Sequence, residues 1–149
     1  MWRARQILSA HPVSYSMVLL ILAFEVSYGL AWAVLGLAAR LGFLGEGALN
    51  PHMSDFIAST SFLQETAFFG SVAFLVGSLL LLLAGSRRVL PVFVAAFLLD
   101  KLDWFALTGN EHYDNILAGQ SELSGYAAIA AHTLVIYLLF SLRLKGDLR

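Results

Sequence analysis

The chain has 149 residues, of which 59% are hydrophobic and only 13% are charged, and its formal net charge is −1 at pH 7. A typical soluble domain is about 45–50% apolar and about 25% charged, so this composition argues against an ordinary soluble enzyme. It also excludes a disordered, collagen-like or nucleic-acid-binding chain. There is no cysteine, which excludes disulfides, thiolate nucleophiles and cysteine-ligated metal centres. The composition predicts a small polytopic membrane protein that forms one domain over residues 1–149.

Four apolar segments are long enough to cross a bilayer as helices, which takes about 20 residues each. The predicted spans are residues 13–39, 60–84, 89–109 and 123–142. The connection between the second and third spans is very short, from Gly85 to Arg88, so these two helices are expected to form an antiparallel hairpin. We therefore expect an all-α fold, an antiparallel bundle of four transmembrane helices.

The basic residues indicate how this bundle is oriented. With four spans, both termini and the 85–88 turn share one side of the membrane, and most lysines and arginines lie there: Arg3, Arg5, Arg87, Arg88, Arg143, Lys145 and Arg149. Only Arg40 falls on the opposite side, where the loops are acidic. The positive-inside rule then places both termini in the cytoplasm. We expect an integral protein of a bacterial inner (plasma) membrane.

Ionisable side chains inside the hydrocarbon region are costly and usually functional. At 1.5 Å per residue, four of them share one level, about 17–21 Å from the cytoplasmic end of their spans: Glu25, Asp100, Asp103 and His132. Lys101 lies about 100° around its helix from Asp100 and is expected to reach a neighbouring helix or to snorkel outward. Glu65 is expected at the outer mouth of the bundle.

Aromatic and small residues accompany these charges. The aromatic side chains are candidates to line an apolar pocket beside them: Phe24, Tyr28, Trp32, Trp104 and Phe105. Small residues allow helices to approach closely, and they form a face on the first and on the fourth span: Gly29, Gly36, Gly125, Ala128 and Ala131.

The buried cluster carries a net negative charge whether or not His132 is protonated. Such a charge requires a protonated carboxyl group, a bound cation or a water-filled cavity that opens to the outside. The sequence therefore predicts a protein that binds or conducts a proton or a cation, in a transport or ion-coupled role. The candidate binding residues are Glu25, Asp100, Asp103, His132, Lys101 and Glu65. Their spacing matches no known metal signature, so no metal site is predicted, and the sequence leaves any cofactor unknown.

Other interpretations of the same residues stay open. One is a membrane-embedded acid–base enzyme that acts on a sterol, isoprenoid or quinone-like molecule, with proton transfer between Glu25 and Asp100. Another is an accessory subunit of a larger membrane complex, for which a lipid-facing Lys101 would be the sign. The charges also fit a purely structural role that holds the helices together. The expected partners are the lipid bilayer and either another membrane protein or a second copy, and not nucleic acid.

Overall fold

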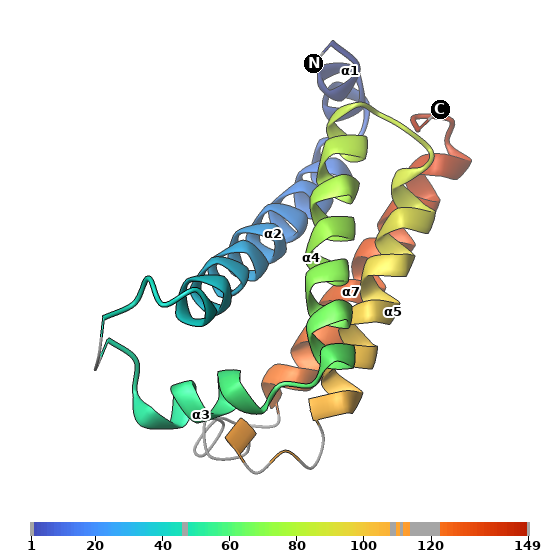
Figure 1. The fold of residues 1–149 in the computed structure, drawn as a ribbon. Helices are drawn as coiled ribbons and strands as arrows, with labels where there is room; N and C mark the ends of the chain where they lie inside the picture. The colour runs from blue at the N-terminus through green and yellow to red at the C-terminus, as the bar shows by residue number, and fades with distance from the viewer. Residues whose placement is uncertain (1, 46–47, 108–109, 111, 114–122, 149) are drawn as a thin grey trace.

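The computed structural model describes residues 2–45, 48–107, 110, 112–113 and 123–148, and the regular structure in these residues is helical, without strands. The helices follow one another as α1 (Trp2–Ala10), α2 (Pro12–Arg40), α3 (Pro51–Ser59), α4 (Phe62–Leu83), α5 (Val89–Leu107) and α7 (Leu123–Leu144) (Figure 1). The expected all-α class is confirmed. The four long helices begin and end within two residues of the predicted spans.

Three helices are long and apolar enough to cross a membrane, namely α2, α4 and the Gly125–Leu144 part of α7. The fourth long helix, α5, has 19 residues and carries Asp100, Lys101 and Asp103 toward its end. The expected membrane association is supported by the three apolar helices. The fourth crossing and the sides on which the termini lie stay predictions.

Local signals explain where the helices begin and end. Pro12 occupies the first turn of α2, where its missing N–H costs nothing. A capping box begins α4, because the Ser61 N–H donates to Gln64 Oε1 over 2.7 Å and the Gln64 N–H donates to Ser61 Oγ over 3.3 Å. At the other end of α4, Gly85 has φ +68°, a left-handed conformation that favours glycine. This turn leads directly into α5.

Two short helices lie outside the predicted spans. The first, α1, precedes α2 and buries Ile7 against the bundle. The second, α3, lies in the connection after α2, where Asn50 caps it by accepting from the His52 N–H over 3.0 Å. Hydropathy alone does not predict a helix in this connection, and the Asn–Pro pair that begins α3 is the local signal for one.

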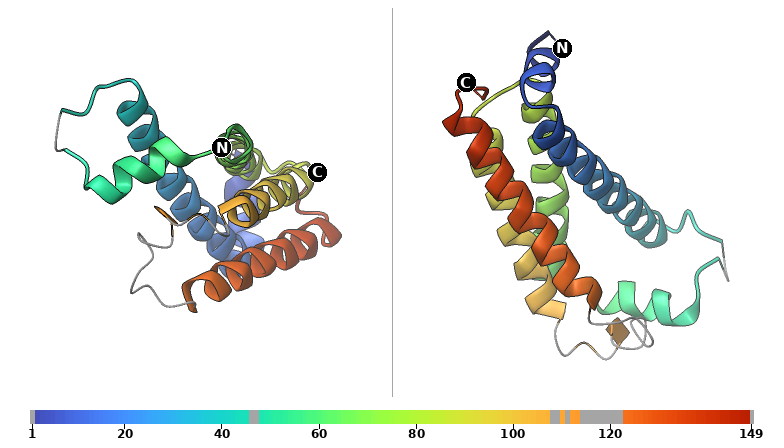
Figure 2. Two further views of the ribbon diagram at one scale, coloured as in Figure 1. Left: turned by 60° about the horizontal axis from the view of Figure 1, so that its bottom comes forward. Right: turned by 180° about the vertical axis from the view of Figure 1, so that it is seen from behind.

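The long helices meet near one end of the molecule and separate toward the other. Both termini lie at the first end, called here the terminal end, and α3 lies at the opposite end, the loop end (Figure 1). Helices α4 and α5 run side by side and α7 packs against α5, whereas α2 leans away from the other long helices toward the loop end (Figure 2). The largest buried side chains belong to the terminal half of the bundle: Tyr15, Leu22, Leu82, Phe93, Leu139 and Leu142.

Helices α2 and α4 pack closely against each other at Gly29. A Cβ atom at this position would lie 3.0 Å from Cγ2 of Val72, so a larger residue would press against the facing helix. Of the other small residues named from the sequence, Gly36 faces the guanidinium of Arg40 on its own helix, and Gly125 has open space around its Cα. At Gly29, α2 is therefore packed closely against α4. Toward the loop end, the distance between α2 and α7 increases (Figure 2).

Candidate functional site

Glu25 and His132, two of the residues singled out in the sequence, meet at the edge of the buried core. Oε2 of Glu25 on α2 lies 3.0 Å from Nε2 of His132 on α7. The imidazole is 4% exposed and the carboxyl side chain 19% exposed. Glu25 stands one position before the buried Val26 and three after the buried Leu22, so it flanks the inward face of α2. The pair therefore has a buried member and a member at the edge of the interior.

The surroundings of His132 fix its ring. Its Nδ1 lies 2.8 Å from the carbonyl oxygen of Ala128, one turn earlier on α7. From α5, the rings of Phe93 and Phe97 lie 5.8 and 5.3 Å from the imidazole, measured between centroids. Both phenylalanines were missed in the sequence, where the only signal was their spacing of four residues on the helix that carries the aspartates.

The hydrogen bonds of His132 define how many protons the pair holds. A carbonyl oxygen only accepts, so Nδ1 must carry a hydrogen and donate it to Ala128. Nε2 then carries a hydrogen only in the imidazolium form. The 3.0 Å contact with Glu25 needs one hydrogen between the two atoms, which leaves two arrangements, imidazolium with carboxylate or imidazole with carboxylic acid. Both arrangements hold one proton in the contact and have no net charge.

The charged group on α5 is separate from this pair. Nζ of Lys101 lies 2.8 Å from Oδ2 of Asp100, its neighbour in the chain. The same Nζ lies 5.7 Å from the ring centroid of Phe97 and 6.0 Å from that of Trp104. Phe97 therefore neighbours both Lys101 and the His132 ring. Asp103 is partly buried, and within the described part of the chain no side chain is hydrogen-bonded or ion-paired with it.

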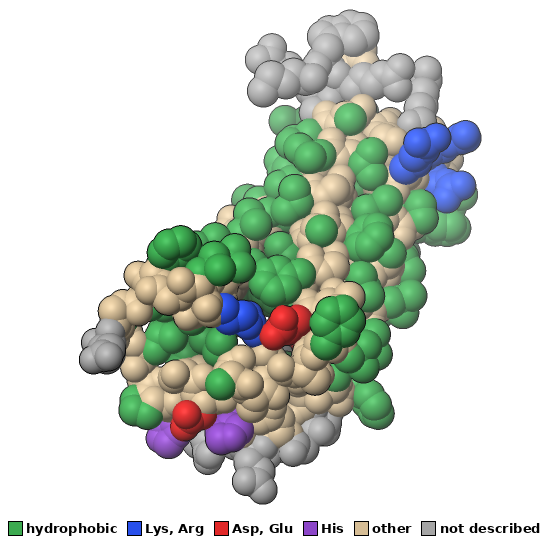
Figure 3. Space-filling view, viewed as in Figure 1, with side chains coloured by type: hydrophobic (Ala, Val, Ile, Leu, Met, Phe, Trp, Pro, Cys, Tyr) green, Lys and Arg blue, Asp and Glu red, His purple; other side chains and the backbone are tan. Residues whose placement is uncertain are grey.

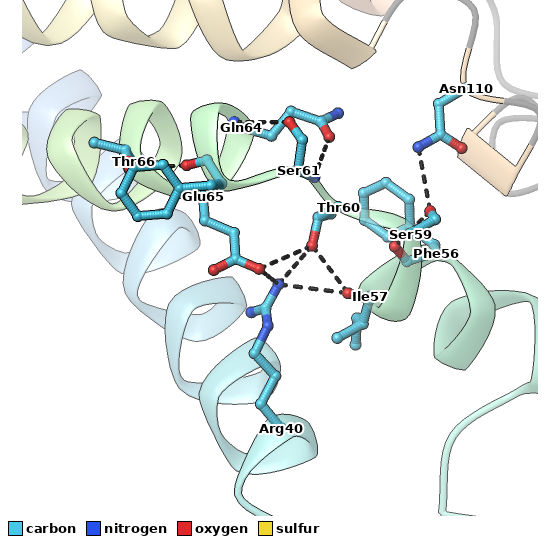
Figure 4. Close-up of polar contacts among 11 residues, drawn as sticks. Arg40, Phe56, Ile57, Ser59, Thr60, Ser61, Gln64, Glu65, Thr66 and Asn110 are labelled. Atoms are coloured by element: carbon cyan, nitrogen blue, oxygen red, sulfur yellow. Dashed lines mark hydrogen bonds and ion pairs between the residues drawn. The ribbon is translucent and has the colours of Figure 1, made fainter.

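Glu65 takes part in a different cluster, at the loop end. Its Oε1 lies 2.8 Å from Nη2 of Arg40, the last residue of α2, and the same Nη2 donates to Thr60 Oγ1 over 2.6 Å (Figure 4). Arg40 and Glu65 border a cavity of about 300 Å³ between α2 and the α3–α4 junction, lined by Ala39, Arg40, Leu49, Ser54, Ile57, Ala58 and Glu65. Figure 3 shows a basic and an acidic side chain together in a hollow on this side of the molecule.

A groove of about 540 Å³ opens between α2 and α7 beside the Glu25–His132 pair. Glu25 is the charged residue in the lining of this groove. The other lining residues are apolar: Leu20, Ile21, Phe24, Ala127, Ala128 and Ala131. The alanines of α7 are too small to fill the space that α2 leaves as it leans away. Of the aromatic candidates from the sequence, Phe24 lines this groove.

The other aromatic candidates lie mainly on the outer surface. The side chains of Tyr28 and Trp104 are 59% and 52% exposed, and Phe105 is 74% exposed. Tyr28 contacts Trp32 edge to face, with 6.2 Å between the ring centroids, and is stacked on Phe24 at 6.3 Å. The rings of Phe24, Tyr28 and Trp32 therefore form an aromatic surface on α2, next to the groove.

The donor set does not form a metal centre. Among the residues that the structure describes, no three His, Asp or Glu side chains come together in a way that would hold a metal ion. Comparisons with protein-family models, with curated proteins and with solved structures find no match for this chain. The contacts of Glu25 and His132 are therefore the basis for assigning chemistry to this site.

Proposed function

We propose that this helical membrane protein conducts protons across the membrane, taking up and releasing one proton at a time at the Glu25–His132 pair. The observation that carries the proposal is the 3.0 Å contact between Glu25 and His132 combined with the Ala128 carbonyl that holds Nδ1 as a donor. Together they make the contact a site for a single proton. Carboxylate and histidine side chains inside membrane helices are typical of proton relays.

The donor set fits a proton better than a larger cation. A hard cation such as Ca²⁺ takes six to eight oxygen ligands, whereas this pair offers one nitrogen and the oxygens of one carboxyl group. The charge of Asp100 is already compensated by Lys101. Loss of the proton would leave a carboxylate facing the lone pair of Nε2, a repulsive arrangement that favours separation of the two side chains.

Exchange of the proton is proposed to proceed through Glu25. Its side chain is more exposed than that of His132 and lines the groove between α2 and α7. His132 is enclosed by Phe93, Phe97 and its own helix. In this arrangement His132 positions and stabilises the proton, while Glu25 is the group that gives it up and receives it.

We further propose that the chain crosses the membrane four times, with α5 as the fourth crossing and both termini in the cytoplasm of a bacterial cell. Pairing of Lys101 with Asp100 supports a place for α5 inside the bilayer, because a compensated pair costs less there than separate charges. A lysine that is paired on its own helix and stacked against Phe97 also favours a self-sufficient chain over an accessory subunit. A homo-oligomer is compatible with this role.

A second candidate function is acid–base catalysis on a lipid-like molecule within the membrane. The groove beside Glu25 favours it, since it would hold an apolar substrate against a group that donates and accepts a proton. In this function Glu25 and His132 act as one acid–base unit, and Asp100 is not the partner of Glu25.

Proton flux into liposomes tests the main proposal. The full chain is reconstituted in vesicles that contain a pH-sensitive dye, and a potassium diffusion potential drives protons inward. We expect the wild-type protein to acidify the vesicles faster than empty liposomes and Glu25→Gln to abolish the difference. Glu65→Gln, which changes a carboxylate of the loop-end cluster, is the matched control. Wild-type flux equal to that of empty vesicles, or undiminished flux in Glu25→Gln, would overturn the proposal.

A further inference from the structure

We infer that the groove between α2 and α7 binds a lipophilic alcohol, a molecule with an apolar body and a hydroxyl group that donates to Oε1 of Glu25. The groove and the second carboxyl oxygen of Glu25 exist in either proton arrangement of the pair, so a ligand can bind here whether or not the pair conducts protons.

The size and lining of the groove fit a small lipid-like ligand. Its volume of about 540 Å³ lies within the range of about 300–1,000 Å³ that is usual for small-molecule sites. Such sites combine an apolar lining with a few polar groups that orient the ligand. Here the apolar part comes from Leu20, Ile21 and Phe24 on one side and from the alanines of α7 on the other, and the polar group is the Glu25 carboxyl.

The carboxyl group of Glu25 selects the type of head group. Its Oε2 is engaged by His132, and among the described residues Oε1 has no hydrogen-bond partner. When Glu25 is a carboxylate, Oε1 carries no hydrogen. When Glu25 is a carboxylic acid, its hydrogen lies on Oε2, between the two side chains, and Oε1 is the carbonyl oxygen. Oε1 is therefore an acceptor in both arrangements, and its partner must be a donor.

A hydroxyl group on an apolar body meets this requirement, whereas a ketone or an ether does not. The groove lies between two helices that are apolar enough to cross a membrane, so a ligand would reach it from the bilayer. This placement favours a long-chain or isoprenoid alcohol over a water-soluble molecule. An acyl chain of an ordinary phospholipid would fill the apolar part but leave Oε1 without its donor.

Photolabelling with two matched probes tests this inference. The protein in lipid nanodiscs is exposed to hexadecanol that carries a diazirine in its chain, or to the methyl ether of the same compound, and the labelled residues are mapped by mass spectrometry. A hydrogen bond to a charged group is worth about 1.5–3 kcal/mol, so we expect the alcohol to label the α2–α7 groove at least about tenfold more efficiently than the ether. Equal labelling by both probes would overturn the inference and indicate occupation by any acyl chain.

Two substitutions on α7 separate filling of the groove from general effects. Ala127 lines the groove and is exposed, so Ala127→Phe fills the space and is expected to remove the label. Ala130 is an exposed alanine of the same helix outside the lining, and Ala130→Phe is expected to leave labelling unchanged. Undiminished labelling in Ala127→Phe, or equal loss in both variants, would contradict the assignment.

Substitution of Glu25 tests the acceptor itself. Glu25→Leu is expected to make the alcohol and the ether equivalent. Glu25→Gln is expected to keep a preference for the alcohol, because its amide nitrogen donates to Nε2 and leaves the carbonyl oxygen as an acceptor without a partner. Alcohol-selective labelling of the wild type together with undiminished proton flux in Glu25→Gln would overturn the proton proposal and leave this one standing. Conversely, proton flux that depends on Glu25, together with equal labelling by the alcohol and the ether, would overturn the ligand inference and leave the proton proposal standing.

Discussion

Glu25 and His132 are separated by 107 positions in the chain, and their side chains meet over 3.0 Å between Oε2 and Nε2. The contact joins α2, the first long helix, to α7, the last. It lies at the edge of the core, beside the groove between α2 and α7. The position gives the pair access to the groove while keeping His132 buried.

Substitutions at Glu25 are expected to affect stability according to the partner that they leave for His132. Glu25→Ala removes the partner of a buried Nε2 and is expected to lower the free energy of unfolding by about 1–3 kcal/mol. Glu25→Gln is expected to cost less, because the amide nitrogen donates to Nε2. Unfolding in mixed detergent micelles measures both values. Equal stability of the two variants would show that the contact does not hold α2 against α7.

The protonation of His132 is expected to change at one ring nitrogen only. Nδ1 donates to the Ala128 carbonyl in both arrangements, so raising the pH is expected to remove the hydrogen from Nε2 and to leave Nδ1 protonated. Nitrogen-15 NMR of selectively labelled histidine distinguishes the two ring positions. His52, in the loop-end helix α3, is a histidine for comparison. A neutral His132 with its hydrogen on Nε2 would contradict the assigned tautomer.

Lys101→Met is expected to destabilise the protein by leaving Asp100 without its partner. If α5 lies in the bilayer as proposed, the loss should exceed the value of about 1 kcal/mol that is typical of surface pairs. The double variant Asp100→Asn/Lys101→Met removes both charges and is expected to recover most of the loss. Thermal stability in detergent and in nanodiscs provides the comparison. A loss that is small in both environments would place α5 in contact with water.

Asp100→Asn by itself tests whether the aspartate belongs to the functional site. The sequence places Asp100 among the candidate binding residues, and in that role its change to Asn, which removes the charge but keeps the shape, would abolish function in a folded protein. The structure pairs Asp100 with Lys101, so we expect Asp100→Asn to reduce proton flux less than Glu25→Gln does. The liposome assay measures both variants side by side. Complete loss of flux in Asp100→Asn with normal stability would extend the site from the Glu25–His132 pair to α5.

Two glycine substitutions compare a close helix contact with an ordinary one. A Cβ at Gly29 would lie 3.0 Å from Val72, and one at Gly77 would lie 3.7 Å from Val92. Gly77→Ala is expected to be neutral or to stabilise α4 by up to about 1 kcal/mol, through its higher helix propensity. Gly29→Ala is expected to destabilise the protein, and Val72→Ala in the same chain should relieve the effect. Thermal unfolding measures the stability of each variant. If Gly29→Ala is as stable as Gly77→Ala, the α2–α4 contact accommodates a Cβ atom at Gly29 without loss of stability.

Local patterns in the sequence determined the helices and their ends. Hydropathy over about 20 residues predicted the four long helices, and Pro12 and Gly85 marked two of their boundaries because their preferences are properties of single residues. The regular rise of a helix also places Glu25 and His132 at one level within their spans. For this reason the sequence could predict that Glu25 and His132 lie close enough to meet.

Rotation and tilt of the helices were decided by the tertiary structure alone. These helices are apolar on nearly all sides, so the sequence does not show which side packs inward. Packing turned Tyr28 and Trp104 outward, brought Phe93 and Phe97 against His132, and left Asp100 with Lys101. The groove exists because α2 packs closely on α4 at Gly29 and leans away from the alanines of α7, a relationship between distant segments that no local pattern contains.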